Sequence, residues 1–293
     1  MESENMVTSN NPLSKYFRQP AIYSTLPSGG DWYPEGSLKF DNAEAKELAV
    51  FPMTAKDEMS MNTPDSLMNG QSVVNVISSC VPGIIDPWLM PIMDMDTVMI
   101  AIRIATYGHD LTLSVTIPEV LEAHDYSIDL RTTSDLIDRS KFDDYVPYQN
   151  LSFRIQPTNY KQLTNMQLRS YEQQRLVSQV VDSEMKPAEK QQQFVTIFEN
   201  MTDITITNMK ETLVSVTADG ETVTDRNYIE DFVDNMDGGM ADSIKKSLSR
   251  QANIGKIQPI DVSPPKEMVE RGAPESFKLP IVMDNSNFFV SRS

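Results

Sequence analysis

The sequence MDTVMIAIRIATY, residues Met95 to Tyr107, predicts a helix that is apolar on nearly every side. A helix of this kind is normally buried at the centre of its domain, because none of its faces suits water. Either Asp94 or Asp96 is expected to start the helix, and Gly108 to end it. The fold should therefore be organised around this stretch.

Arg103 lies in the middle of this apolar helix. A buried guanidinium cannot be left without partners, so Arg103 should reach a carboxylate or a set of backbone carbonyls. A salt bridge is the default expectation. We interpret Arg103 as a structural buried charge and not as a reactive group.

Short elements are predicted on the amino-terminal side of the helix. The run from Leu48 to Pro52 reads as a strand, and Thr54 and Thr63 each stand where a helix can be capped. A further helix is expected from Ser72 to Val81, with Cys80 on its apolar face. Cys80 is therefore interpreted as a small buried apolar residue and not as a thiolate.

The pattern changes to a period of two after Gly108. Leu111 to Val115 and Tyr126 to Leu130 predict a β-hairpin, and Leu151 to Ile155 a third strand. The acidic, aromatic run KFDDYVPYQN, residues 141–150, is expected to be a loop.

Helical periodicity returns for the second half of the chain. One long helix is predicted from about Thr158 to Met185, and a second from Pro187 through Leu213 and Val216, paired antiparallel to the first. Two shorter helices are expected at 225–236 and 240–252. Prolines then favour an extended return that ends in the strand-like run SFKLPIVM.

Together these patterns predict an α+β, helix-rich fold with a buried central helix, a small antiparallel β-sheet and a helical second half. We expect four regions: an extended amino-terminal arm (1–34), a core (35–157), a helical region (158–255) and an extended carboxy-terminal return (256–293).

The arm carries aromatic residues among prolines that prevent a helix. Such residues must be buried either on the body of this protein or on a neighbouring subunit, and the sequence leaves both alternatives open. Aromatic side chains commonly dominate interface energies. The candidate partner contacts, taken with two aromatic residues near the carboxyl terminus, are Tyr16, Phe17, Tyr23, Trp32, Tyr33, Phe288 and Phe289.

Composition excludes several classes of function. The 25 basic and 42 acidic residues give a net charge of −17, which would repel a phosphate backbone, so nucleic-acid binding is not expected. The acidic surface serves either solubility or docking onto a basic partner. Cys80 is the only cysteine, so no internal disulfide can form, and no apolar run is long enough for a membrane span. We expect a soluble protein that stays in a cytoplasm.

No catalytic constellation is apparent. His109 and His124 each precede an aspartate, as in metal phosphohydrolases, but such sites need further histidines and the chain has two in all. No serine sits in a nucleophile elbow, and no glycine-rich loop is built to hold phosphate. We therefore expect no catalytic residue, no metal ligand and no cofactor. A hydrolase that uses the His-Asp pairs is retained as a competing hypothesis.

Four runs in order carry a family resemblance: FPMTAKDE (51–58), TPDSLMNGQ (63–71), VVNVISSCVPGIIDPW (73–88) and DMDTVMIAIRIATYG (94–108). With PLSKYFRQPAIYSTLPSGG (12–30) and MDNSNFF (283–289), they resemble the baseplate hub and hub assembly proteins of T-even-type contractile-tailed phages. The resemblance covers the arm and the first hundred residues well, and the helical second half poorly.

The resemblance implies a late, non-enzymatic protein of the virion tail baseplate that is assembled in the host cytoplasm. Its partners would be other baseplate or tail hub proteins, within a larger oligomeric assembly. The alternative is a hub assembly chaperone that is absent from the mature virion. A host adaptor or scaffold unrelated to phage tails is a further alternative.

Some members of the family carry Cys-x-x-Cys pairs suited to zinc. The corresponding positions here read IPEV (117–120) and VSPP (262–265), without cysteine. We expect no zinc, and packing of Ile117, Val120 and Val262 in its place.

Overall fold

The computed structural model describes residues 11–61, 70–281 and 288–289. Its class is α+β and rich in helix, as the sequence predicts. The helix expected to begin after Thr63 lies outside the described residues.

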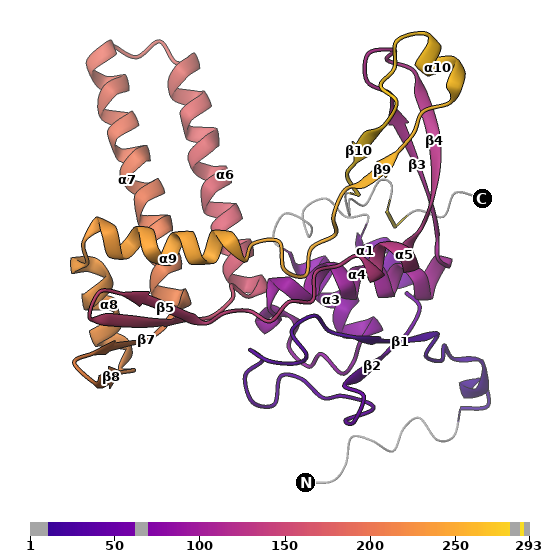
Figure 1. Ribbon diagram of the computed structural model, residues 1–293, viewed down its shortest axis with the longest axis horizontal. Helices are drawn as coiled ribbons and strands as arrows, with labels where there is room; N and C mark the ends of the chain where they lie inside the picture. Colours follow the sequence, from indigo (N-terminus) through magenta and orange to yellow (C-terminus); the bar gives the residue numbers. More distant parts are fainter. Residues whose placement is uncertain (1–10, 62–69, 282–287, 290–293) are drawn as a thin grey trace.

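The central helix is α4, Ile92–Tyr107 (Figure 1). Gly108, with a φ of 83°, ends it, and its amide donates to the carbonyl of Ile104. The run from Val98 to Arg103 is buried throughout, which confirms the prediction of a buried central helix.

The predicted start of this helix is wrong. Pro91 precedes the first turn and no side chain caps it. The Asp94 and Asp96 carboxylates instead accept hydrogen bonds from segments far away in the sequence, at Ser28 and at Ile257. A carboxylate in the first turn is stabilised by the helix dipole. Here each carboxylate also binds a segment that is distant in the sequence.

Elements from the amino-terminal third pack around α4. Strand β1 (Ile22–Thr25) pairs antiparallel with β2 (Glu47–Val50). Helix α1 (Ala55–Met61) begins after Thr54, whose hydroxyl accepts from the amide of Asp57 at 3.3 Å, as the capping pattern predicts. The other elements here are η1 (Ser14–Tyr16), α3 (Gln71–Cys80) and η2 (Pro87–Leu89).

The predicted hairpin is confirmed as β3 (Asp110–Thr116) paired with β4 (Ala123–Asp129), after which Leu130 begins helix α5 (Leu130–Asp135) instead of extending the strand. The carboxy-terminal return lies beside this hairpin (Figure 1), with the Tyr126 and Phe277 rings edge to face at 6.0 Å. Its elements are β9 (Ile260–Val262), α10 (Lys266–Glu270) and β10 (Phe277–Leu279).

The structure has more sheet than the single small sheet expected. Besides three two-stranded sheets, the described residues form a four-stranded sheet in the order β5-β6-β7-β8. These strands are β5 (Tyr145–Tyr148), β6 (Leu151–Ile155), β7 (Leu213–Ala218) and β8 (Glu221–Val223).

Two of these strands correct the sequence predictions. The run 141–150, expected to be a loop, contains β5, where Pro147 is tolerated because β5 is an edge strand. Leu213 and Val216, assigned to a helix, lie in β7 with Val216 opposite Phe153. The alternation LVSVTA suits a pleated strand, and burial against β6 decides the choice.

The four predicted helices of the second half are confirmed. Asn159, Asp225 and Asp237 cap three of them with their side chains. The helices are α6 (Tyr160–Asp182), α7 (Pro187–Thr212), α8 (Arg226–Asn235) and α9 (Gly238–Arg250).

Two hydrophobic cores meet at the start of α4. The first surrounds α4, and the second joins β5, β6 and β7 to α8 and α9, with Met93 of α4 in its interior. At Gly255 the chain leaves the second core for the first, and there its backbone lies against that of Met93. A Cβ atom on Gly255 would lie 1.7 Å from the Met93 carbonyl oxygen, and its φ is 76°, so only glycine fits this crossing.

Among the described residues, Arg103 has no carboxylate partner for the salt bridge expected by default, and it takes the other predicted course of binding backbone carbonyls. Its Nε donates to the carbonyl of Phe288 at 2.7 Å, and its two terminal nitrogens donate to Gly108 at 3.1 Å and Asp110 at 3.3 Å. The guanidinium also lies over the Tyr107 ring at 4.7 Å. Arg103 therefore joins the central helix to the end of the chain through backbone carbonyls.

Replacing Arg103 with Met should lower the free energy of unfolding by about 2–5 kcal/mol, because three carbonyl oxygens in or near the core lose their donor. Urea unfolding followed by circular dichroism measures this. Arg154→Met, which breaks an exposed pair with Asp144, is the matched control and should change stability little. Equal effects of the two substitutions would contradict the assignment.

Candidate contact site

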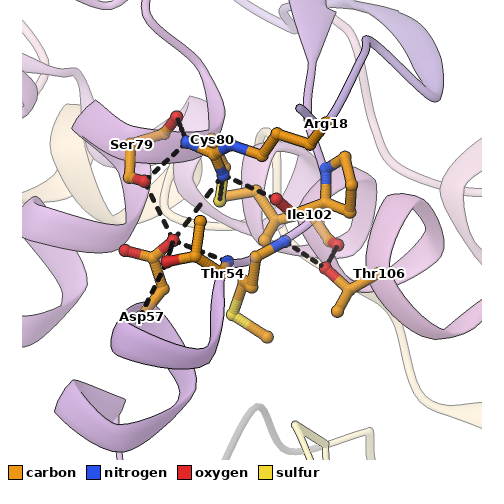
Figure 2. A network of polar contacts seen from close by, with 9 residues as sticks. Arg18, Thr54, Asp57, Ser79, Cys80, Ile102 and Thr106 are labelled. Atoms are coloured by element: carbon orange, nitrogen blue, oxygen red, sulfur yellow. Dashed lines mark hydrogen bonds and ion pairs between the residues drawn. The ribbon is translucent and has the colours of Figure 1, made fainter. Parts of the chain in front are cut away.

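Besides the pairing of β1 with β2, two part-buried networks of side-chain hydrogen bonds tie the arm to the body of the protein. The first is centred on Arg18, whose guanidinium points toward Ser79, Cys80 and Asp57 (Figure 2). One terminal nitrogen donates to the carbonyl of Pro52 at 2.6 Å, and the other to the carbonyl and hydroxyl of Ser79 at 2.6 and 2.8 Å. Arg18 therefore fixes the arm to both α1 and α3.

Asp57 is the acceptor at the centre of this network. Its Oδ2 accepts from the Thr54 amide and hydroxyl at 2.8 and 2.7 Å and from the Ser79 hydroxyl at 2.9 Å, and lies 3.6 Å from Arg18. The side chain is buried, and these hydrogen bonds replace the contacts with water that burial removes. The cap of α1 and the anchor of the arm are therefore the same group.

Cys80 lies at the edge of the network, 3.7 Å from an Arg18 nitrogen. Burial, followed by the charge of Asp57, raises the pKa of its thiol to about 11. The thiol therefore stays protonated near neutral pH, in agreement with its interpretation as a buried apolar residue.

The second anchor is Asp94 on α4. One carboxylate oxygen accepts from the Ser28 amide at 2.8 Å, and the other from the Ser28 hydroxyl at 2.6 Å and the Tyr33 hydroxyl at 3.0 Å. Burial raises the pKa of Asp94 to about 6, against the opposing effect of these hydrogen bonds. The arm is thus tied to the buried central helix itself.

Trp32 and Tyr33 pack on the body of the protein and not into solvent. Trp32 has a φ of 72°, which is uncommon for an aromatic residue, and its ring meets Phe142 edge to face at 5.6 Å. Tyr33 packs against the first core. For these two aromatics the structure shows intramolecular anchoring.

The rest of the arm presents apolar side chains to solvent. Four residues, which we call the arm surface, are at least half exposed: Leu13 at 60%, Tyr16 at 73%, Phe17 at 50% and Tyr23 at 58%. One of the four, Phe17, lines an open hollow of about 560 Å³ together with Arg18, Phe51, Met53, Thr54, Ser79 and Pro82. Sequence reasoning selected the three aromatics of this surface but missed Leu13 and the anchor Arg18.

Phe288 and Phe289 are not exposed, in contrast to the sequence expectation. Phe288 is fully buried and Phe289 is 7% exposed, with their rings edge to face at 5.0 Å in the first core. Two adjacent aromatic residues near the end of a chain can equally well be buried in the hydrophobic core as exposed to a partner. The structure assigns them to folding.

The two His-Asp pairs do not converge. His109 precedes β3 and His124 is in β4 opposite Val115, so they lie toward opposite ends of the hairpin. Among the described residues, no group of three histidine, cysteine or acidic side chains is placed to hold a metal ion. Of the three residues expected to pack in place of a metal, Ile117 is buried, and Val120 and Val262 are half-buried.

Comparison with known proteins places the chain. The family model described as T4 bacteriophage base plate protein matches residues 22–257. The chain belongs to this family. The match extends through the helical second half of the baseplate protein, beyond the region where sequence motifs carry a clear resemblance. No curated protein and no solved structure was found to match it. None of the helices within the described parts of this baseplate protein has the length and apolarity needed to cross a membrane.

Replacing Arg18 with Ala should release the amino-terminal end of the arm while the body stays folded, since the guanidinium makes the contacts from this part of the arm to α3. Limited proteolysis followed by mass spectrometry should show faster cleavage between residues 11 and 22. The global free energy of unfolding should fall by about 1–3 kcal/mol, as for other buried charge-assisted bonds. An unchanged cleavage rate would contradict the anchor.

Asp94 should make stability depend on pH in a defined direction. Its folded pKa of about 6 exceeds the ordinary value of 3.8, so its contribution is largest below pH 3.8 and falls as pH rises toward 6. The stability of the wild type relative to Asp94→Asn should therefore drop by roughly 2–3 kcal/mol between about pH 4 and pH 7. Urea unfolding across this range measures it, and a constant difference would contradict the shifted pKa.

Proposed function

We propose that this baseplate protein is a non-enzymatic structural component of the hub of a contractile phage tail, and that it binds other baseplate or hub proteins through the arm surface. Family membership supports a structural baseplate role. The observation that carries the finer proposal is the anchored arm, which exposes Leu13, Tyr16 and Phe17 near its amino-terminal end and Tyr23 on β1.

Anchoring makes the arm surface a suitable contact. Arg18 lies next to Phe17 and holds the chain on α1 and α3, so a partner meets side chains that are already in place. A preorganised surface binds more tightly because less conformational entropy is lost on association. Apolar aromatics beside an open hollow also match the composition of interface hot spots.

An assembly chaperone absent from the mature virion is a second candidate. Met59, Met185 and Met201 are exposed, at 71%, 43% and 39%, and flexible thioethers suit transient, adaptable contacts. Mass spectrometry of purified virions separates the two candidates, because a structural component must be present in the particle. The hub proposal expects the protein there.

Hydrolysis through the His-Asp pairs finds little support in the geometry. The two histidines lie toward opposite ends of β3 and β4, and His124 packs edge to face on Tyr126 at 4.9 Å. A shared metal or a shared reacting atom would require them to be close together.

The double substitution Tyr16→Ser with Tyr23→Ser should leave the unfolding midpoint of the purified protein nearly unchanged, because both rings are exposed. It should reduce tail assembly in infected cells by about tenfold or more, as expected for interface aromatics. Complementation of a phage that lacks the gene measures this.

The matched control is Tyr145→Ser with Tyr228→Ser, two tyrosines of similar exposure that lie on β5 and α8. It should support normal assembly. Equal titres for the two double variants, both folded, would contradict the arm surface as the contact.

A further inference from the structure

Helices α6 and α7 form a hairpin that rises away from the rest of the molecule (Figure 1). At its base, α6 packs on η2 and α4, and α7 packs on α8 and β7. Figure 1 shows the far half, toward the loop at 183–186, clear of the other elements. In this far half, α6 and α7 pack on each other.

The seam between the two helices fixes which sides face outward. Val180 and Ile197 are buried in it, and the Asn200 amide donates to the Gln173 side chain at 3.2 Å. Gln173 and Ile197 therefore point across the seam, and every other position follows at ~100° per residue. In an antiparallel pair, positions rotated in the same sense from the seam come to the same side of the hairpin.

The two sides of the hairpin differ sharply in charge. On one side, at about 40–120° from the seam, lie eleven residues that we call the uncharged face: Gln167, Ser170, Gln174, Val177, Val181, Gln191, Phe194, Phe198, Met201, Thr205 and, slightly farther round, Ser178. Charged residues of both signs fall on the opposite side or on the outer edges, among them Arg169, Glu172, Glu199 and Asp203. Lys190 is an exception: it lies near the loop at about 20° from the seam on the uncharged side, and its ammonium donates to the Val181 carbonyl at 2.9 Å.

The uncharged face exposes large apolar groups. Phe198 is 61% exposed, Val181 58% and Met201 39%. At its edge, Phe198 lines a shallow hollow with Val195, Thr202 and two acidic residues of the outer edge, Glu199 and Asp203. Apolar side chains gathered on one side of a projecting element, with the charges gathered on the other, indicate that the face is covered in a complex.

We propose that the uncharged face binds the same face of a second copy of this chain, forming an antiparallel four-helix bundle. Each copy carries a net charge of −17, so two copies repel one another over most of their surfaces. The uncharged face is where that repulsion is least and where apolar area is available. A two-fold interface uses the same patch on both copies, and a face without charge is complementary to itself.

The size of the face decides how tight this contact can be. The face runs along about fifteen residues of each helix, so at ~1.5 Å rise per residue it is roughly 22 Å long. Two helices, each ~10 Å across, make it roughly 20 Å wide. The two faces of a dimer would together bury roughly 900 Å². Specific stable interfaces bury about 1,200–2,000 Å², so this one belongs with weak contacts. Self-association should therefore depend on concentration in solution and become substantial where an assembly holds copies side by side.

Sedimentation of the full chain at about 5–200 µM tests the proposal, since this range covers weak dimers. The wild type should shift from monomer to dimer. Phe198→Glu should weaken the dimer at least tenfold without changing the far-ultraviolet circular dichroism spectrum, because it places a like charge on both faces. The matched control, Thr196→Glu, adds the same charge on the opposite side and should leave dimerisation unchanged.

A second pair of variants decides the matter if Phe198→Glu does not fold. Ser178→Cys on the uncharged face and Gln179→Cys on the opposite side of the hairpin each add one exposed thiol, while Cys80 is buried. A short bismaleimide should join two copies of the first variant and not of the second. A monomer at every concentration, equal effects of the two glutamates, or cross-linking at residue 179 alone would overturn the proposal. These measurements use the purified chain and do not depend on the role of the arm surface.

Discussion

The structure depends on the burial of one helix that has no polar side. Because α4 is apolar nearly all round, a two-layer arrangement cannot cover it, and segments from distant parts of the chain must surround it. The arm and β2 cover it from the amino-terminal side, the β3–β4 hairpin continues from its end, and Phe288 arrives from the far end of the chain. The first core therefore consists of segments packed around α4, and the second core joins it at Met93 of α4.

Polar groups hold these wrapping segments in place. Asp94 binds Ser28 and Tyr33 of the arm, Asp96 binds the amide of Ile257, and Arg103 binds the carbonyl of Phe288. Each is a charge on α4 that would be costly to bury alone, so each requires its segment to be docked. Asp57 is likewise a buried charge, and Arg18 of the arm is one of its partners. The arm surface and the hairpin of α6 and α7 lie outside these ties, and they are the surfaces that we propose as contacts with other proteins.

Local patterns in the sequence predict much of this fold. The apolar run of α4, the Thr54 cap, the β3–β4 alternation and the long helices all express preferences that neighbouring residues decide. The errors fall where partners distant in sequence decide: β5 is a strand because β6 is beside it, and Leu213 leaves the helix because Ile155 pairs with it. For the candidate site, aromatic content marked Tyr16, Phe17 and Tyr23, but nothing local separates them from the buried Phe288. Arg18 and Asp94 could not be recognised as anchors, since their partners are 61 and 66 residues away.

The central claim is that this baseplate protein works through an arm that its own body holds in place for a partner. Photo-cross-linking from a benzophenone amino acid at position 23, in tails assembling in infected cells, tests it most directly. The account expects a covalent adduct with another baseplate or hub protein from position 23, and none from the same label at the exposed position 228. Absence of any adduct from position 23 in cells that assemble tails normally, or the same adducts from both positions, would contradict it.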